Sequence, residues 1–195
     1  MNRRVVYLVF GPQGSGKSTQ AEFLSTKLKL PFFDSGSELR RIAEGESEIA
    51  VELSTTLKHG ALVSNDILED IFEEFISNHN CENGMVIDGF PRTIEQAKLL
   101  SKLSHKYNWE IVSFFVDISD ETAKNRLSKR YKLVNGKKVF RSDDKPEVVS
   151  KRLELFKQET LPVIDWLAGE YVLHRIDGEP SRDEVFKEIL SNINE

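Results

Sequence analysis

The sequence predicts an α/β fold in which helices flank a five-stranded parallel sheet. Short β-prone runs recur along the chain, and helical patterns fill the spaces between them. This alternation is typical of parallel strands joined by crossover helices. The runs at 5–10 and 111–116 are almost continuously apolar, as expected for strands that are buried on both faces. The other runs cover residues 31–34, 85–88 and 171–176.

The composition is that of a single globular domain. The chain has 195 residues, of which 39% are hydrophobic and 30% are charged, and this is enough for one α/β domain with a sizeable core. The net charge of −5 argues against a general binder of nucleic acid or of anionic membranes. No apolar run approaches the length of a membrane span, and no signal-peptide pattern precedes the first strand, so we expect a cytoplasmic protein.

The single cysteine and the scattered histidines limit the metal sites that the chain can form. Cys81 alone excludes an internal disulfide framework and a zinc site with several thiolates. None of the four histidines lies three to five residues from another. We therefore expect surface or structural roles for all of them.

The glycine-rich turn after the first strand is the strongest functional signal. Residues 11–18 match the phosphate-binding pattern G-x-x-x-x-G-K-[ST]. Backbone N–H groups of such a turn close round phosphate oxygens, and the positive end of the following helix favours the anion. Lys17 adds a charge for the terminal phosphates, and the Ser18 hydroxyl is a candidate Mg²⁺ ligand. The alternative is a glycine-rich connection without a ligand, which the position between a strand and a helix disfavours.

A second set of polar residues follows the run at 85–88. Asp88 ends this run, and Gly89 and Arg92 follow within four residues. Because open parallel sheets bind ligands at the carboxyl ends of their strands, Asp88 and Arg92 should face the same crevice as Lys17. We expect Asp88 to hold Mg²⁺ through water and Arg92 to bind a phosphate with two parallel hydrogen bonds. The alternative is a turn with an ordinary surface arginine.

Two intervals depart from the alternation of strands and helices. Residues 35–64 carry a polar helical pattern, which predicts an insertion on the sheet rather than another crossover. Between residues 130 and 144, Asn135-Gly136 separates two short β-prone runs and indicates a hairpin, because both residues tolerate positive φ. A hairpin with about four residues in each arm is marginal alone, so this one is a candidate lid.

Further arginines accumulate in the second half of the chain. Arg126 and Arg130 are four residues apart and share one face of a predicted helix, and Arg141 and Arg152 follow the hairpin. A solvated charged face is the plain alternative for the first pair. Phosphoryl transfer, however, depends on positioning and on electrostatic stabilisation of the transferring group. Such a site needs several cations and no covalent nucleophile, and the arginines of this sequence supply the cations.

Taken together, the motifs resemble one known family in order and along nearly the whole chain. After the phosphate loop come residues 34–40 (DSGSELR), 60–63 (GALV), 88–97 (DGFPRTIEQA), 126–130 (RLSKR), 141–144 (RSDD), 152–153 (RL) and 160–164 (TLPVI). This series resembles the adenylate kinase branch of the nucleoside monophosphate kinases, which are phosphate-loop proteins. The element D-G-F-P-R followed by Gln96 is highly specific to that family.

The resemblance implies one domain with three parts. The core would comprise residues 1–34, 65–130 and 145–195, with a monophosphate-binding insertion at 35–64 and a lid at 131–144. The implied reaction is the reversible, Mg²⁺-dependent transfer of the ATP γ-phosphoryl group to AMP, which gives two ADP. The expected partners are therefore the small-molecule nucleotides ATP, AMP and ADP.

The resemblance also implies roles for individual positions. The ATP site would consist of Gly14, Ser15, Gly16, Lys17, Ser18, Thr19, Arg126 and Pro180. The AMP site would consist of Ser35, Arg40, Val63, Gly89, Arg92, Gln96, Arg141 and Arg152. The implied catalytic residues are Lys17, Arg92, Arg130, Arg141 and Arg152. The implied Mg²⁺ ligands are Ser18 and Asp88.

Two positions bear on the base of the acceptor. The amide of Gln96 pairs with adenine as donor and acceptor together. Ser35 supplies a hydroxyl where adenylate kinases usually have threonine and pyrimidine-specific relatives often have alanine, so AMP is favoured. A kinase for UMP, CMP or several monophosphates is the nearest alternative. A regulatory protein that binds nucleotides without transferring a phosphoryl group is the alternative from another class.

Two further expectations come from what the sequence lacks. The lid has none of the four zinc ligands that some longer lids of the family carry, so no structural zinc is expected. No apolar heptad or other assembly signature is present, so we expect the monomer that is usual in the family.

Overall fold

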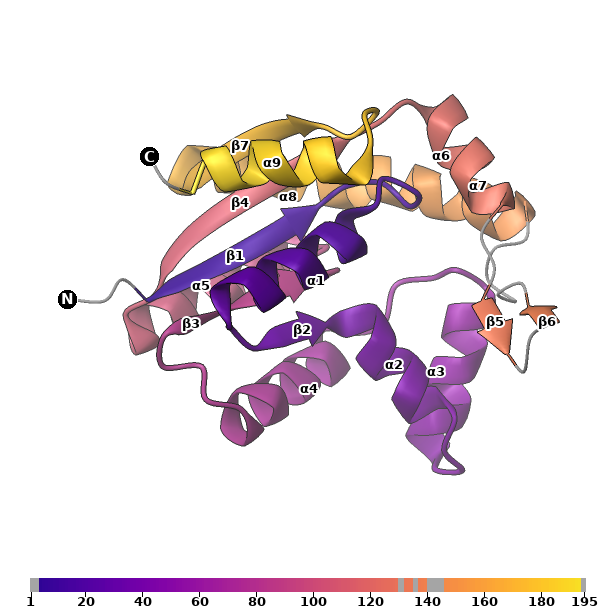
Figure 1. Ribbon diagram of the computed structural model, residues 1–195. Coiled ribbons are helices and arrows are strands. Elements are labelled where there is room, and N and C mark those ends of the chain that lie inside the picture. The colour runs from indigo at the N-terminus through magenta and orange to yellow at the C-terminus, as the bar shows by residue number, and fades with distance from the viewer. Residues whose placement is uncertain (1–3, 130–131, 135–136, 140–145, 194–195) are drawn as a thin grey trace.

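A five-stranded parallel sheet forms the centre of the molecule, in the strand order β2-β3-β1-β4-β7 (Figure 1). The strands are β1 (Val5–Phe10), β2 (Phe32–Asp34), β3 (Gly84–Asp88), β4 (Glu110–Asp117) and β7 (Val172–Asp177). Neighbouring strands are parallel throughout, and each overlaps a predicted run, so the predicted fold class is confirmed. The structure is a computed structural model that describes residues 4–129, 132–134, 137–139 and 146–193.

The central strand β1 is buried on both faces of the sheet. Leu8 belongs to the larger core, which α4, α5 and α8 cover. Tyr7 and Val9 belong to the core on the other face, which α1 and α9 cover. These helices are α1 (Lys17–Leu28), α4 (Asn65–Asn78), α5 (Ile94–Tyr107), α8 (Leu161–Glu170) and α9 (Arg182–Ser191). Within the described part of the chain, no helix is long and apolar enough to cross a membrane.

The order of the strands determines where a ligand can bind. The chain runs from β1 through α1 to the edge strand β2, and from β3 through α5 to β4 on the far side of β1. Because α1 and α5 lie on opposite faces of the sheet (Figure 1), the segments that leave β1 and β3 diverge. Parallel sheets bind ligands at the carboxyl ends of such a pair of strands.

Two helices, α2 (Ser35–Ala43) and α3 (Glu48–Lys58), occupy the predicted insertion. The side chains of Asp34 and Ser47 cap these helices by accepting a backbone N–H from three residues further on. Leu39, Leu53 and Val63 of the insertion form an apolar cluster with Leu68 of α4, and Ile71 joins this cluster to the larger core of the sheet.

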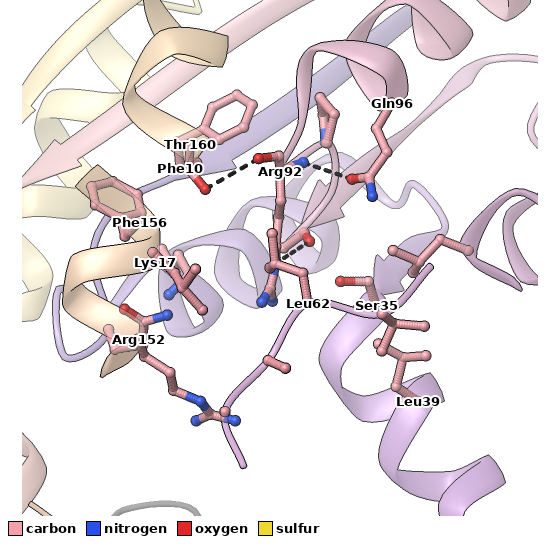
Figure 2. A pocket seen from close by; sticks show the side chains of 18 of the residues that line it. Phe10, Lys17, Ser35, Leu39, Leu62, Arg92, Gln96, Arg152, Phe156 and Thr160 are labelled. Atoms are coloured by element: carbon pink, nitrogen blue, oxygen red, sulfur yellow. Dashed lines mark hydrogen bonds between the residues drawn. The ribbon is translucent and has the colours of Figure 1, made fainter. Parts of the chain in front are cut away.

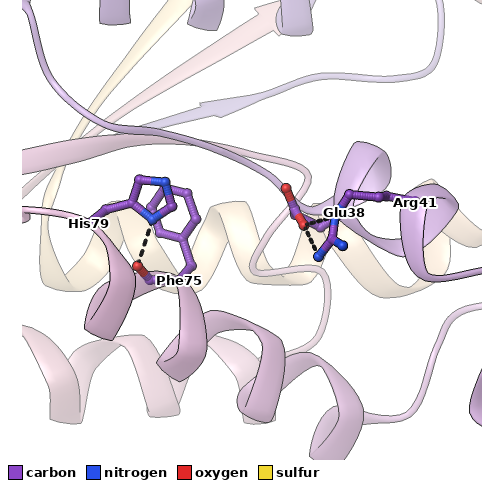
Figure 3. A network of polar contacts seen from close by, with 4 residues as sticks. All are labelled: Glu38, Arg41, Phe75 and His79. Atoms are coloured by element: carbon purple, nitrogen blue, oxygen red, sulfur yellow. Dashed lines mark hydrogen bonds and ion pairs between the residues drawn. The ribbon is translucent and has the colours of Figure 1, made fainter.

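Local polar contacts fix α2 and the end of α4 (Figure 3). On α2, Arg41 pairs with Glu38 at 3.0 Å, but both side chains are solvated, so the pair contributes little to stability. At the end of α4, the His79 ring stacks on Phe75 with centroids 4.0 Å apart, and its Nδ1 lies 2.9 Å from the carbonyl oxygen of Phe75. The ring centroids of Phe75 and Phe33 lie 5.1 Å apart. Because Phe33 belongs to β2, the stack connects the end of α4 to the sheet.

The predicted hairpin is present as β5 (Lys132–Val134) and β6 (Lys137–Val139), which pair in antiparallel fashion. Its turn, Asn135-Gly136, lies outside the described residues. The hairpin follows α6 (Asp120–Ser128) and precedes α7 (Pro146–Leu155), which continues through a π-helix, Phe156–Thr160, into α8.

Core packing beneath α5 gives a direct test of this fold. Leu100 is fully buried in the larger core, whereas Lys98 lies on the exposed side of the same helix. Leu100→Ala should lower the free energy of unfolding by about 2–5 kcal/mol, because it leaves a cavity that the sheet cannot fill. Urea denaturation measures this change. Lys98→Ala is the matched control and should stay within about 0.5 kcal/mol of the unchanged protein.

Candidate active site

The phosphate loop joins β1 to α1 in a conformation that requires glycine. Gly14 and Gly16 both have a φ of 90°, a region in which side chains with a Cβ are strained. A Cβ on Gly14 would also lie 2.8 Å from the carbonyl oxygen of Ala123 on α6. Gly16 is the N-cap of α1 and supplies no capping side chain. The N-terminus of α1 is therefore suited to an anionic ligand.

A groove runs along this loop towards the segment between β7 and α9. Residues of the loop, of α6 and of that segment line it. The structure thus brings together all the residues expected at the ATP site, namely Gly14, Ser15, Gly16, Lys17, Ser18, Thr19, Arg126 and Pro180.

Arg126 is held in place by backbone oxygens on both sides of this groove. Its guanidinium donates to the carbonyl oxygens of Ser15 at 3.4 Å, Gly178 at 3.0 Å and Glu179 at 3.1 Å. The Glu179 carboxylate accepts the backbone N–H of Ser119 at 2.9 Å and the Thr122 hydroxyl at 2.8 Å, and these two hydrogen bonds lower its pKa. The segment after β7 is therefore tied to α6, and the Arg126 guanidinium is held between that segment and the phosphate loop.

A second pocket lies between the phosphate loop and the insertion (Figure 2). Side chains reach it from β1, α1, α2, the segment after β3, α7 and the π-helix. Of the residues expected at the AMP site, those that line it are Ser35, Val63, Gly89, Arg92, Gln96 and Arg152. Lys17 and Gln13 line both this pocket and the groove along the loop, so the two meet at these residues.

Arg92 is largely buried and fixed by its own loop. Its Nε donates to the carbonyl oxygen of Gly89 at 2.7 Å, and its carbonyl oxygen accepts the Thr160 hydroxyl at 3.4 Å. Burial lowers the pKa of the Arg92 guanidinium, Asp88 opposes this effect, and the nearby cations of Arg152 and Arg40 add to it. The neighbouring cations repel one another, and a ligand with negative charge would relieve this repulsion.

Gly89 permits this arrangement because it has no side chain. Its φ is 77°, and a Cβ would lie 2.6 Å from the Ser35 hydroxyl oxygen and 2.9 Å from Nη2 of Arg92. The peptide bond that follows, Phe90-Pro91, is cis. Ser35 itself is 1% exposed, and its Oγ has no hydrogen-bond partner among the described residues. A buried hydroxyl without a partner at the wall of a pocket is available to a ligand.

Asp88, at the end of β3, is only 2% exposed. Burial raises the pKa of its carboxyl group, while the charge of Lys17 and a hydrogen bond from Ser18 oppose the rise. Its Oδ1 has no hydrogen-bond partner within the described part of the chain. Across those same residues, no group of three or more His, Cys, Asp or Glu side chains is placed to hold a metal ion. Asp88 and Ser18 therefore offer two oxygen ligands, and the rest of any Mg²⁺ shell would come from phosphate and water.

Three expected residues are not among the described residues that line the pocket. Arg40 does not line it, since its Nη2 donates to the Ser37 hydroxyl at 3.0 Å on α2. Arg130 and Arg141 lie outside the described residues.

Two residues that line the pocket, Gln13 and Thr160, were given no role from the sequence. Gln13 lies within the phosphate-loop motif, but its position there accepts any residue, so no pattern marked it.

The fold and the paired sites define the class of this protein: it is a phosphate-loop nucleotide kinase. A family model described as adenylate kinase matches residues 9–171. The adenylate kinase of Chlamydia felis is 34% identical to this chain, with 100% of both chains covered. That of Leptospira biflexa is 33% identical, over 98% of this chain and 100% of the relative. The chain belongs to the adenylate kinase family.

The raised pKa of Asp88 gives a prediction for stability. As the pH rises above the unfolded-state pKa of about 3.9, the unfolded chain loses this proton before the folded one does. The free energy of unfolding therefore falls as the pH rises through the folded-state pKa, and the full penalty remains above it. Asp88→Asn cannot ionise, so it should melt at an equal or higher temperature than the unchanged protein at pH 7.5.

Calorimetry at pH 3.5 and pH 7.5 measures this effect. The melting temperature should rise by about 2–4 °C for each kcal/mol of penalty removed, and the gain should disappear at pH 3.5. Asp70→Asn, which alters an exposed carboxylate on α4, controls for the change in net charge. A lower melting temperature of Asp88→Asn at pH 7.5 would contradict the prediction.

Proposed function

We propose that this chain transfers the γ-phosphoryl group of ATP reversibly to AMP, giving two ADP. The single observation that carries the proposal is the position of Lys17, which lines both the groove along the phosphate loop and the second pocket. An ammonium at the junction of two anion sites stabilises a phosphoryl group that passes between them. The names of the relatives agree with this reaction.

ATP is assigned to the groove along the loop. The glycine turn and the N-terminus of α1 would bind its phosphates. Arg126, fixed by three carbonyl oxygens, would lie flat against the adenine, and the backbone near Pro180 would contact the same ring.

AMP is assigned to the second pocket. Its phosphate would meet Arg92 and Arg152, whose mutual repulsion an anion relieves. Arg40 would approach from α2. Ser35, Val63 and Gly89 would line the nucleoside, and Gln96 would pair with the base. The apolar side chains of Leu39, Val63 and Leu68 would pack against the nucleoside.

Ser18 and Asp88 would hold Mg²⁺, Asp88 in part through water. The support is a buried carboxylate oxygen without a partner beside a hydroxyl of the phosphate loop. When bound with ATP, Mg²⁺ neutralises charge on the phosphates and orients them.

The chemical step that we propose is direct, in-line attack by a phosphate oxygen of AMP. No general base is required, because the acceptor phosphate is already an anion at neutral pH. Lys17, Arg92 and Arg152 would stabilise the charge on the transferring group, together with Arg130 and Arg141. The hairpin at 131–144 would act as a lid and the insertion at 35–64 as a second moving part, and their closure would exclude water.

We further propose that the protein acts as a monomer. Residues of a single chain line both the groove and the pocket. Nucleotides are then its only partners, without nucleic acid or membrane, and a cytoplasmic location stays a prediction.

A panel of acceptors tests the reaction. Purified protein with Mg-ATP is offered AMP, UMP, CMP, GMP or no acceptor, and the products are separated by chromatography. ADP formation should require an acceptor and be far faster with AMP than with the other monophosphates, and chelation of Mg²⁺ should stop it. Equal or better use of UMP or CMP would make this a pyrimidine monophosphate kinase. Tight ATP binding without transfer to any acceptor would leave a nucleotide-binding regulatory protein.

A pair of conservative variants tests the assignment of the two sites. Arg92→Lys should raise the KM for AMP by about 10- to 100-fold with little change for ATP, because lysine cannot form two parallel hydrogen bonds to a phosphate. Arg126→Lys should raise the KM for ATP and leave that for AMP nearly unchanged. Steady-state kinetics with each nucleotide varied in turn measures both constants. Equal effects of either variant on the two nucleotides would contradict the assignment.

A further inference from the structure

Hydrogen bonds fix the amide of Gln96 at the wall of the second pocket. Gln96 is 2% exposed, and its Oε1 accepts the backbone N–H of Arg92 at 2.7 Å (Figure 2). Its Nε2 donates to Oδ1 of Asn65 at 2.8 Å. The Thr93 hydroxyl donates to the same Asn65 oxygen at 3.4 Å. Each end of the Gln96 amide therefore has a protein partner on one side.

We propose that Asn65 is a positioning residue that determines which purine the second pocket accepts. Asn65 does not line the pocket and acts only through Gln96. The inference rests on the proposed function, because that function places the acceptor base against Gln96.

The contacts of Gln96 define which end of its amide is which. A free amide can turn over and offer its oxygen and its NH2 group in either order. Here the N–H of Arg92 requires an oxygen, and Oδ1 of Asn65 requires an N–H group. Turning the Gln96 amide over would set its NH2 group against the backbone N–H of Arg92 and lose that hydrogen bond. Its oxygen would then face Asn65, whose own amide would have to turn over as well before it could donate.

The fixed amide still has capacity for a base. A carboxamide has two N–H groups and two lone pairs on oxygen, and the protein uses one of each. The remaining lone pair on Oε1 and the remaining N–H group on Nε2 are therefore available to a base in one order only, with the acceptor on the Oε1 side and the donor on the Nε2 side.

Adenine matches that order, because its exocyclic amino group donates and the neighbouring ring nitrogen accepts. Hypoxanthine has nearly the same shape, but it carries a carbonyl oxygen and a ring N–H in the reverse order. It would face the amide with two repulsive contacts or force it to turn over. The N–H of Arg92 and the side chain of Asn65 together therefore disfavour IMP, and Asn65 does so without touching the nucleotide.

Because of its position in the fold, Asn65 can be substituted with little disturbance of the core. It is the first residue of α4, immediately after the insertion, and its side chain is exposed. Its neighbour Ser64 is the N-cap of α4 but makes no side-chain capping bond. Ser64→Ala is therefore a matched control that changes the same turn without touching Gln96.

The experiment compares kcat/KM for AMP and IMP with Mg-ATP. Asn65→Ala should lower the AMP/IMP ratio by about 3- to 10-fold, as expected when one hydrogen bond no longer orients the amide. The rate with saturating AMP should stay within about twofold of the original, because the phosphate contacts are unchanged. Asn65→Asp keeps an oxygen acceptor in the same place and should keep or raise the ratio, and Ser64→Ala should not change it.

A purely structural role at the start of α4 would change the constants for AMP and IMP by the same factor. An unchanged ratio in Asn65→Ala, or a ratio lost in Asn65→Asp, would overturn the inference. If Asn65→Ala does not fold, Asn65→Ser, whose hydroxyl is too short to reach Gln96, takes its place with the same expected fall. If the unchanged protein fails to phosphorylate AMP, the proposed function itself fails, and the inference fails with it.

Discussion

Positive charge gathered at the carboxyl edge of the sheet is the constraint on which the rest of this structure depends. Lys17 and the N-terminus of α1 lie on one side, and Arg92 with Arg152 on the other. Burial and repulsion lower the pKa of Arg92, and Asp88 is the buried anion that opposes them. Without a ligand, the burial and mutual repulsion of these charges therefore lower the stability of the folded state. Bound phosphate groups reduce this destabilisation. The site accepts lower stability in exchange for the electrostatic stabilisation that phosphoryl transfer requires.

The parallel sheet makes this concentration of charge possible. β1 lies between β3 and β4 and is buried on both faces, so backbone pairing with both neighbours and packing on both faces fix its direction and register. The phosphate loop at the end of β1 and the Asp88–Arg92 segment at the end of β3 must then emerge side by side. Large apolar cores on both faces of the sheet hold in place the strands from which these glycine turns emerge.

Short polar contacts give the site its finer geometry. Arg126 binds three carbonyl oxygens across the groove, and the loop that carries Arg92 is held by Gly89, Gln96 and Thr160. Preorganised groups of this kind lose little freedom when a ligand binds. Recognition of the base thus depends on residues that the nucleotide need not touch.

The sequence by itself determined the sheet, the phosphate loop, the hairpin, and the polar residues at the ends of β1 and β3 that face the carboxyl edge. These features follow from local information: periodicity, glycine at turns, and the rule that parallel strands bind ligands where they end. Only the tertiary structure decided that Gln96 meets Asn65, 31 positions away, and that Thr160 meets Arg92, 68 positions away. Such contacts join polar side chains from separate elements. They follow no period in the sequence, because the packing of α4, α5 and the π-helix around one pocket sets them.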